Sequence, residues 1–549
     1  MKKRKNLKVA QILLAAAIAA AMVLTGACSG DSGSGAGDAT TASTAAAQTT
    51  AAPEPATEAA GEATSAAAAD APAATTAAPA TVAAAVDTSG LSPRNAEGLR
   101  VDASSEGDVI TIAMDEWKRD LFQPSIDLFN ATYPNIKLEY RSVEIANNEV
   151  MTALAASNDL PDVIYDMQNP LPFFISQGWL APIDKYVAGD PDFAFVPQDS
   201  IDWRTYGGRL YAMPVRAHIT NTVVVNLDLM EELNLDLPPE DWTFDDYREF
   251  LVAGTTDQYS GAEELHGSDV LGPAFAKGEH LWGYHQDTNT FDLTDGWIKG
   301  ANFVNEVRAI PGVVAGTLRT QDPPSAYYED PDCDYTRKFG EGDIADGWMA
   351  FRMGKVLTVS SDTASQVDFR YLPFSWTFHS IPQDPSVGVR PAIQGTNTVM
   401  CSTTKHPEAA AEVLKWFSYG EKGSIACLDC YYNKDASDPD SGSLFIVPVT
   451  NNPNILAKFA TLGLVSDGIS YMAANMDSAI HFDLYALMPG YADTFDNVLN
   501  PAAEAVGRGE DVSSVAAETS LKATESIQAA RADFDAALGA VQAEYDASH

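Results

Sequence analysis

Residues 109–165 read VITIAMDEWKRDLFQPSIDLFNATYPNIKLEYRSVEIANNEVMTALAASNDLPDVIY, and this stretch decides the fold. Three short segments are apolar or alternate apolar with charged residues, which is typical of β-strands; they are residues 109–113, 136–140 and 162–165. Two longer segments, 121–130 and 149–157, have the residue pattern of helices. Strand, helix, strand, helix and strand within about sixty residues predict a parallel sheet with right-handed crossovers, and therefore an α/β fold.

Ligands of parallel sheets bind at the carboxyl ends of the strands. The loops Met114–Lys118 and Asp166–Asn169 follow the first and third predicted strands. An aromatic side chain can stack on the C–H face of a sugar, and carboxylates and amides can bond its hydroxyls. These two loops supply the candidate ligand-binding residues Glu116, Trp117, Asp166, Gln168 and Asn169. Two alternatives stay open: Trp117 as a core aromatic, and Asp166 as the N-cap of a helix.

Seven segments along the chain share a further likeness. They are SIDLFNATYPNIKLEY (125–140), ALAASNDLPDVIYD (153–166), FFISQGWLAPIDKYV (173–187), GGRLYAMPVRAHITNTVVVNLDLMEELNLDLPPEDWTFDDYREF (207–250), DGWMAFRMGKVLTVSSD (346–362), TTKHPEAAAEVLKWFSYGEKG (403–423) and PGYADTFDNVLNPAAEAVGRGED (489–511). In this order they resemble the family 1 extracellular solute-binding proteins, across nearly the whole folded region. The resemblance implies a two-lobe periplasmic-binding-protein type II fold, with a hinge and an interlobe cleft. It also implies capture of a sugar or oligosaccharide for the permease subunits of an ABC transporter.

The same resemblance suggests how the chain divides between the lobes. We expect lobe one to comprise residues 106–211 and 392–445, and lobe two to comprise residues 212–391 and 446–549. Similarity to maltose-type binding proteins points to the loops after strands one and three, and to the loop Ser360–Thr363, which contains Asp362.

Two further candidates come from the residues themselves. Trp282, within GEHLWGYHQ, is expected to line the cleft from lobe two. Arg216 follows an apparent strand near the crossover, where it could bind a sugar or form a salt bridge between the lobes. We expect no cofactor and no metal.

The N-terminus predicts export. A basic stretch precedes the apolar run Ile12–Leu24, which is shorter than the about 20 residues needed to span a bilayer, so residues 1–27 are predicted to be a signal peptide. The signal ends in LTGAC, which resembles a bacterial lipobox, although Thr25 stands where a lipobox usually has Leu. Either Cys28 is lipidated, or ordinary cleavage near Ala27 releases a soluble protein. Two acyl chains would anchor the protein stably.

Residues 28–105 are predicted to be a disordered tether. Ala, Thr, Ser, Gly, Pro and Glu dominate this region, and residues 29–100 contain no Phe, Trp or Tyr. Such a segment cannot bury enough apolar surface to fold. Together with a lipid on Cys28, it would hold the folded part at the extracellular face of the cytoplasmic membrane, as in Gram-positive bacteria.

Composition and missing motifs narrow the function. The net charge of −42 argues against binding to nucleic acid and against docking on anionic lipid. The motifs of α/β-hydrolases, zinc proteases and P-loop enzymes are missing, so we expect a binding protein and not an enzyme. We also expect the protein to be a monomer. A glycan hydrolase with two carboxylates, or a sensor with the same fold, stays as the alternative. The last four cysteines are expected to form a local disulfide or stay as buried thiols: Cys333, Cys401, Cys427 and Cys430.

Overall fold

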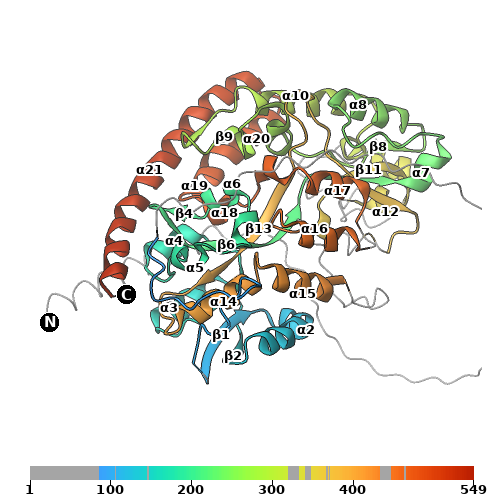
Figure 1. Ribbon diagram of the computed structural model, residues 1–549. Coiled ribbons are helices and arrows are strands. Elements are labelled where there is room, and N and C mark those ends of the chain that lie inside the picture. The colour runs from blue at the N-terminus through green and yellow to red at the C-terminus, as the bar shows by residue number, and fades with distance from the viewer. Residues whose placement is uncertain are drawn as a thin grey trace, which may run out of the picture. The chain divides into compact units, whose positions relative to one another are not determined.

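The computed structural model describes residues 86–105, 107–144, 147–319, 333–340, 348–365, 369, 371–432, 447–462 and 465–548. All of them belong to the unit Thr76–His549 (Figure 1). The predicted signal peptide, Cys28 and the tether up to residue 85 lie outside the described residues. The described part contains no helix that is both long and apolar enough to cross a membrane.

The predicted parallel strands are present in the first sheet. Strand β1 (Asp108–Met114) pairs in parallel with both β2 (Ile136–Ser142) and β3 (Val163–Met167), and helices α2 (Glu116–Thr132) and α3 (Asn148–Ala156) connect them. The order of the strands is β14-β13-β3-β1-β2, and β6 also pairs with β13. These additional strands are β6 (Ala212–Ile219), β13 (Ala392–Met400) and β14 (Ile480–His481).

Aromatic packing joins α2 to helix α14 (Pro407–Trp416). Phe129 of α2 meets Trp416 edge to face, with ring centroids 5.4 Å apart. Pro407 starts α14, because the first helical position needs no backbone N–H donor. Helix α15 (Glu421–Tyr432) packs on the same side of α2.

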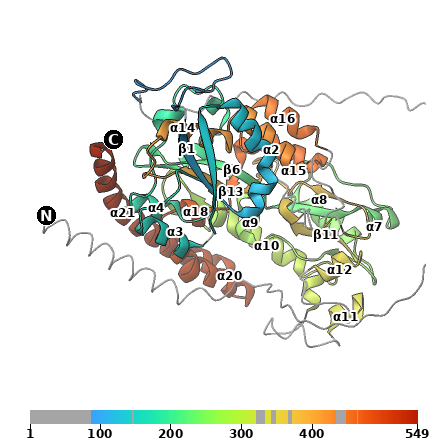
Figure 2. The same cartoon turned by 90° about the horizontal axis from the view of Figure 1, so that it is seen from below.

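The second sheet has the order β12-β7-β11-β8. Its strands are β7 (Thr222–Asn226), β8 (Ser260–Ala262), β11 (Val356–Ser361) and β12 (Trp376–His379). Phe244, at the start of α8 (Phe244–Ala253), packs its ring 4.9 Å from that of Phe303 on α10 (Gly296–Arg308). In the view of Figure 2, α7, α8, β11 and α12 lie together, apart from β1 and α14.

The chain crosses between the sheets after β6 and before β13. Asn221 joins the two crossing segments: its Nδ2 donates to the carbonyl of Arg390 at 2.9 Å, and its Oδ1 accepts from the amide of Ala392 at 2.7 Å. The predicted lobe boundary at 211–212 differs from this arrangement, because β6 pairs with β13 in the first sheet. The boundary placed from the resemblance did not include this pairing, which joins Ala212 to Val399.

The C-terminal region does not stay with the second sheet, where it was predicted to lie. Strand β14 joins the first sheet. Helix α21 (Val512–Ser548) runs from beside α10 to beside α4 (Leu171–Ser176) (Figure 1). Near α10, Thr524 accepts a hydrogen bond from the amide of Phe291 at 2.9 Å. Near its end, Gln542 donates to the carbonyl of Tyr206 at 3.1 Å.

Part of the predicted tether is ordered, which corrects that prediction. Leu99 is only 3% exposed, and Arg94 forms an ion pair of 2.9 Å with Asp190. The backbone of Arg100 donates to the carboxylate of Glu412 at 3.1 Å. Residues 86–105 therefore pack against the folded part of the chain. Any tether must end before residue 86. The composition of this segment does not reveal that it is ordered, because a few buried residues such as Leu99 and Arg100 are enough to hold it in place.

The four cysteines among the described residues, Cys333, Cys401, Cys427 and Cys430, are free and buried. Cys427 Sγ lies 3.5 Å from Ser125 Oγ, and burial raises the pKa of its thiol to about 12. The buried-thiol alternative therefore holds in this structure. The remaining helices and strands are α5 (Asp184–Val187), α6 (Gln198–Asp202), β4 (Thr205–Tyr206), β5 (Arg209–Leu210), α7 (Leu227–Glu232), α9 (Ser268–Leu271), β9 (Tyr284–His285), β10 (Thr290–Phe291), α11 (Asp334–Phe339), α12 (Met349–Arg352), α16 (Pro453–Ala460), α17 (Asp467–Ala473), α18 (Leu484–Leu487), α19 (Tyr491–Thr494), a π-helical turn (Phe495–Leu499) and α20 (Asn500–Gly507).

Candidate ligand-binding site

A large hollow is lined by residues of the first sheet, by residues near the second sheet and by residues of the C-terminal region. Its cavity volume is about 740 Å³, within the about 300–1,000 Å³ of most small-molecule sites. The first sheet and the loop after β3 contribute Gln168, Asn169, His218, Gln394, Gly395 and Thr396. The region around the second sheet contributes Asp269, Leu281, Trp282 and Ala364, and the C-terminal region contributes Phe482, Asp483, Tyr485, Ala486, Tyr491, Ala492, Phe495 and Asp496.

Three residues predicted from the sequence line this hollow. Gln168 and Asn169 directly follow β3, at the carboxyl end of a parallel strand. Trp282 lines it from the side of the second sheet and is 5% exposed. Its ring lies against that of Trp297, with centroids 6.4 Å apart, and meets the edge of Phe495 at 6.1 Å. Trp282 is thus a fixed part of the wall.

Asp166 does not line the hollow. Strand β3 extends to Met167, so Asp166 lies in a strand, with φ of 64°, and the N-cap of α4 is Pro170. The alternative that made Asp166 an N-cap is therefore wrong. Its carboxylate is 1% exposed, pairs with the ammonium of Lys118 and accepts a hydrogen bond from Thr396 Oγ1. Because Thr396 lines the hollow, Asp166 supports the site from behind.

Glu116 and Trp117 lie in the first turn of α2, and not in a loop. Trp117 is 44% exposed, which rules out the core alternative. The ammonium of Lys118 lies 5.1 Å from its ring centroid. Neither Glu116 nor Trp117 is among the residues that line the hollow. Both follow the carboxyl end of β1, at the same sheet edge as the residues after β3.

The other two candidates, Asp362 and Arg216, are not among the described residues that line the hollow. Asp362 follows β11 and accepts hydrogen bonds from the amide and hydroxyl of Ser365, at 2.9 and 3.2 Å. Its neighbour Ala364 lines the hollow, but Asp362 does not. Arg216 lies on β6, and its side chain falls outside the described residues.

Sequence reasoning missed the aromatic segment 482–496. Four of its rings line the hollow: Phe482, Tyr485, Tyr491 and Phe495. Helix α21 fixes this segment from behind, through a hydrogen bond of 2.7 Å between Thr494 and Ser526. A Cβ at Gly490, where φ is 74°, would lie 2.2 Å from that of Ala530. Aromatic residues spaced closely around Pro489-Gly490 were the available signal.

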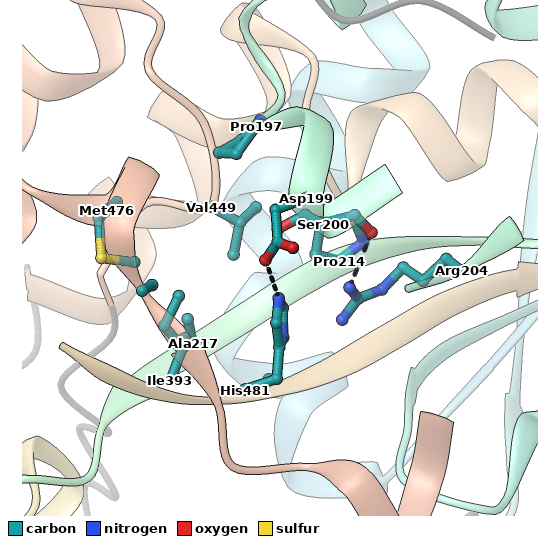
Figure 3. Close-up of a pocket in the computed structure, with 12 residues that line it drawn as sticks. Pro197, Asp199, Ser200, Arg204, Pro214, Ala217, Ile393, Val449, Met476 and His481 are labelled. Carbon is teal, nitrogen blue, oxygen red and sulfur yellow. Dashed lines mark hydrogen bonds and ion pairs between the residues drawn. The ribbon is translucent and has the colours of Figure 1, made fainter. Parts of the chain in front are cut away.

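A charged network lines a second pocket, which Figure 3 shows, and its member Asp483 also lines the hollow. His481 Nε2 lies 2.9 Å from a carboxylate oxygen of Asp199, and its Nδ1 lies 3.5 Å from Asp483. Arg204 lies 3.7 Å from Asp483 and donates to the carbonyl of Ser200 at 3.0 Å. Figure 3 shows the imidazole of His481 pointing at Asp199.

The two carboxylates decide the charge of His481. Burial disfavours the protonated imidazole, but hydrogen bonds and attraction from Asp199 and Asp483 outweigh it and raise the pKa of His481 to about 9. His481 is therefore a cation at neutral pH. It immediately precedes Phe482 and Asp483, which line the hollow, so the network fixes the start of the aromatic segment.

The chain matches a family model described as bacterial extracellular solute-binding protein, over residues 115–418. Solved structures match as well. The sugar-binding protein MalE from Xanthomonas citri is 14% identical, with a TM-score of 0.57, over 78% of this chain and 99% of that one. A sugar transporter from Rhizobium etli in an open conformation is 17% identical, with a TM-score of 0.55, over 77% and 99%.

A third match is the cyclic alpha-maltosyl-1,6-maltose binding protein from Arthrobacter globiformis. It is 16% identical, with a TM-score of 0.52, over 76% of this chain and 98% of that one. At these identities the likeness concerns the fold. The fold is the two-lobe periplasmic-binding-protein type II fold, in which the two sheets described above form the cores of the lobes.

Proposed function

The chain belongs to the bacterial extracellular solute-binding proteins, and we propose that it is the lipid-anchored substrate-binding subunit of an ABC importer for a sugar or oligosaccharide. The observation that carries this proposal is the hollow, which has aromatic and polar walls supplied from both sheets. Aromatic rings offer stacking surface to the C–H face of a sugar ring. Amides and carboxylates offer partners to its hydroxyls.

Three features support a carbohydrate ligand. The hollow holds five aromatic residues beside the amides of Gln168, Asn169 and Gln394. Its cavity volume of about 740 Å³ leaves room for more than one sugar ring. The matched proteins from Xanthomonas citri, Rhizobium etli and Arthrobacter globiformis carry names that refer to sugars.

Capture would proceed by closure of the lobes about the crossing segments. We place lobe one at the first sheet, up to Ile219, and lobe two at the second sheet, from Thr222. Between them, Thr220 and Asn221 bond the strand of the return crossing. Closure would bring Trp282 toward Gln168 and Asn169 across the hollow and would exclude water from the ligand. Helix α21 contacts both lobes, so closure has to bend or shift its contacts.

The predicted lipid anchor at the N-terminus determines where in the cell the protein would act. A lipid on Cys28 would anchor the chain at the extracellular face of the cytoplasmic membrane, where the permease subunits receive the ligand. Residues 29–85 would then link the anchor to the ordered residues that start at position 86. No catalytic step is part of this proposal.

The test is a thermal-shift screen of the protein without residues 1–27 against mono- and oligosaccharides. A ligand at 100 times its dissociation constant adds about 2.7 kcal/mol to the free energy of unfolding. Hits are then titrated by calorimetry against Tyr485→Ala, which removes a 48% exposed ring from the hollow, and against Leu521→Ala on α21 as the control. Only Tyr485→Ala should weaken binding. Release of reducing ends during incubation would indicate a hydrolase instead.

A further inference from the structure

We propose that the hollow selects carbohydrates that carry no negative charge, and that Asp269 and Asp496 impose this selection. The inference rests on the proposed function, because it concerns the ligand of the same hollow. It adds a substrate class: neutral or basic sugars bind, whereas uronic acids and phosphorylated sugars are rejected.

The charged residues of the hollow carry the argument. Three carboxylates line it, whereas the described lining side chains include neither lysine nor arginine. Asp483 is offset by Arg204 and His481, at 3.7 and 3.5 Å. Asp269 and Asp496 form no ion pair with any residue that the structure describes. Their charge therefore acts on whatever enters the hollow.

Asp269 stands beside the aromatic wall. It lies on the short helix α9 and accepts hydrogen bonds only from backbone amides, its own and that of Val270. Burial raises its pKa from the usual value. The pKa of Tyr491 is also raised, by burial first and then by the charge of Asp269, and the Tyr491 side chain is hydrogen-bonded to Trp282. A ligand stacked on this wall would lie close to the carboxylate.

Asp496 adds a second carboxylate on the same wall. It belongs to the π-helical turn Phe495–Leu499 and is exposed at the hollow, next to Phe495. The ring of Phe495 lies 6.1 Å from those of both Trp282 and Tyr491. Both carboxylates therefore line the same hollow as this aromatic cluster.

The net charge of the chain has the same sign as these two carboxylates. The whole chain carries a net charge of −42. Asp496 is exposed, so solvent weakens its repulsion of an anionic group, whereas the partly buried Asp269 acts through a lower effective dielectric. An anionic sugar would meet this repulsion, and electrostatic steering would slow its entry.

A neutral sugar gains from the same groups. A hydroxyl donates to a carboxylate in a short, charge-assisted hydrogen bond, which is about twice as strong as a bond between neutral groups. An ammonium group would gain further, from the carboxylates and from the aromatic faces. The hollow therefore distinguishes neutral and cationic sugars from anionic ones, and no described lysine or arginine lines it to attract an anion.

The experiment compares sugars that differ only in charge. Calorimetric titration of the protein without residues 1–27 uses maltotetraose, cellotetraose and the same two compounds oxidised at C6 to uronates, with chitosan tetraose as the cationic probe. We expect at least one neutral or cationic tetraose to bind and its oxidised form to bind at least about tenfold more weakly. Binding of an oxidised form as tight as that of its neutral parent would overturn the inference and leave the proposed function standing.

Variants assign the effect to the two carboxylates. Asp269→Asn combined with Asp496→Asn keeps the shape of both side chains and should reduce the neutral-to-anionic ratio several-fold. Asp533→Asn, on the exposed face of α21, removes the same charge away from the hollow and should leave the ratio unchanged. A ratio that survives the double variant, or uronate binding that Arg216→Gln abolishes, would refute the assignment. If none of the five sugars binds in any assay, the proposed function and this inference both fall.

Discussion

The charged network that lines the second pocket predicts a specific loss of stability at high pH. His481 is 3% exposed and has a pKa of about 9 in the folded protein, against about 6.5 in an unfolded chain. A raised folded-state pKa stabilises the fold fully below pH 6.5, and this contribution disappears as the pH rises through 9. The difference between the two pKa values corresponds to about 3 kcal/mol, present in full only at low pH.

The usable window lies between pH 7.5 and 9.5. With these two pKa values, His481 still contributes about 2 kcal/mol at pH 7.5 and almost nothing at pH 9.5. His280, the neighbouring imidazole, does not interfere, because burial lowers its pKa to about 3 and it stays neutral throughout. The wild-type protein should therefore lose about 2 kcal/mol of unfolding free energy across the window.

Denaturant unfolding at the two pH values measures this loss. His481→Gln removes the titrating group, so the variant should be less stable than the wild type at pH 7.5 and should approach it at pH 9.5. The same pH dependence in the variant and the wild type would refute the reasoning, since it would show that His481 is not protonated between Asp199 and Asp483. Ligand affinity should fall in the same window, because His481 precedes residues that line the hollow.

Three further outcomes are expected. Trp117→Ala should leave ligand affinity in calorimetric titration and unfolding free energy each unchanged within about 0.5 kcal/mol, because the ring is 44% exposed and does not line the hollow; a loss of about 2 kcal/mol of affinity would place Trp117 in the site. Asn221→Ala should cost about 1–3 kcal/mol in urea unfolding, since it leaves the carbonyl of Arg390 and the amide of Ala392 without partners; no measurable cost would show that the crossing segments hold together without it. Cys28→Ala should shift the protein from the membrane to the medium of a Gram-positive host, and equal release of both forms would argue against lipidation.

The sequence predicted those strands whose residue pattern can be recognised within a few neighbouring residues. The β-branched run at Val109–Ala113 and the alternation at Ile136–Tyr140 became β1 and β2, paired in parallel as expected. Strands β13 and β14 could not be assigned to this sheet in the same way, because their pairings join segments that are far apart in the sequence, such as Asn397 with Met167 and Ala392 with Ile480. Helix α2 starts at Glu116, five residues before the apolar residues from Leu121 by which it was predicted.

The site was predictable where it depends on topology and unpredictable where it depends on packing. The rule for strand ends placed Gln168 and Asn169 at the hollow. The same rule included Asp166, but this carboxylate turns into the protein toward Lys118. The aromatic segment 482–496 was missed because its position depends on α21, which packs behind it through Ser526 and Ala530.

The central claim is that a carbohydrate binds in the hollow between the two lobes. A crystal structure of the protein with the tightest oligosaccharide from the screen tests it most directly. The account predicts sugar rings inside the hollow, in contact with Gln168, Asn169 and Trp282. A sugar bound on the outer surface, or a hollow that stays empty at saturating ligand, would contradict it.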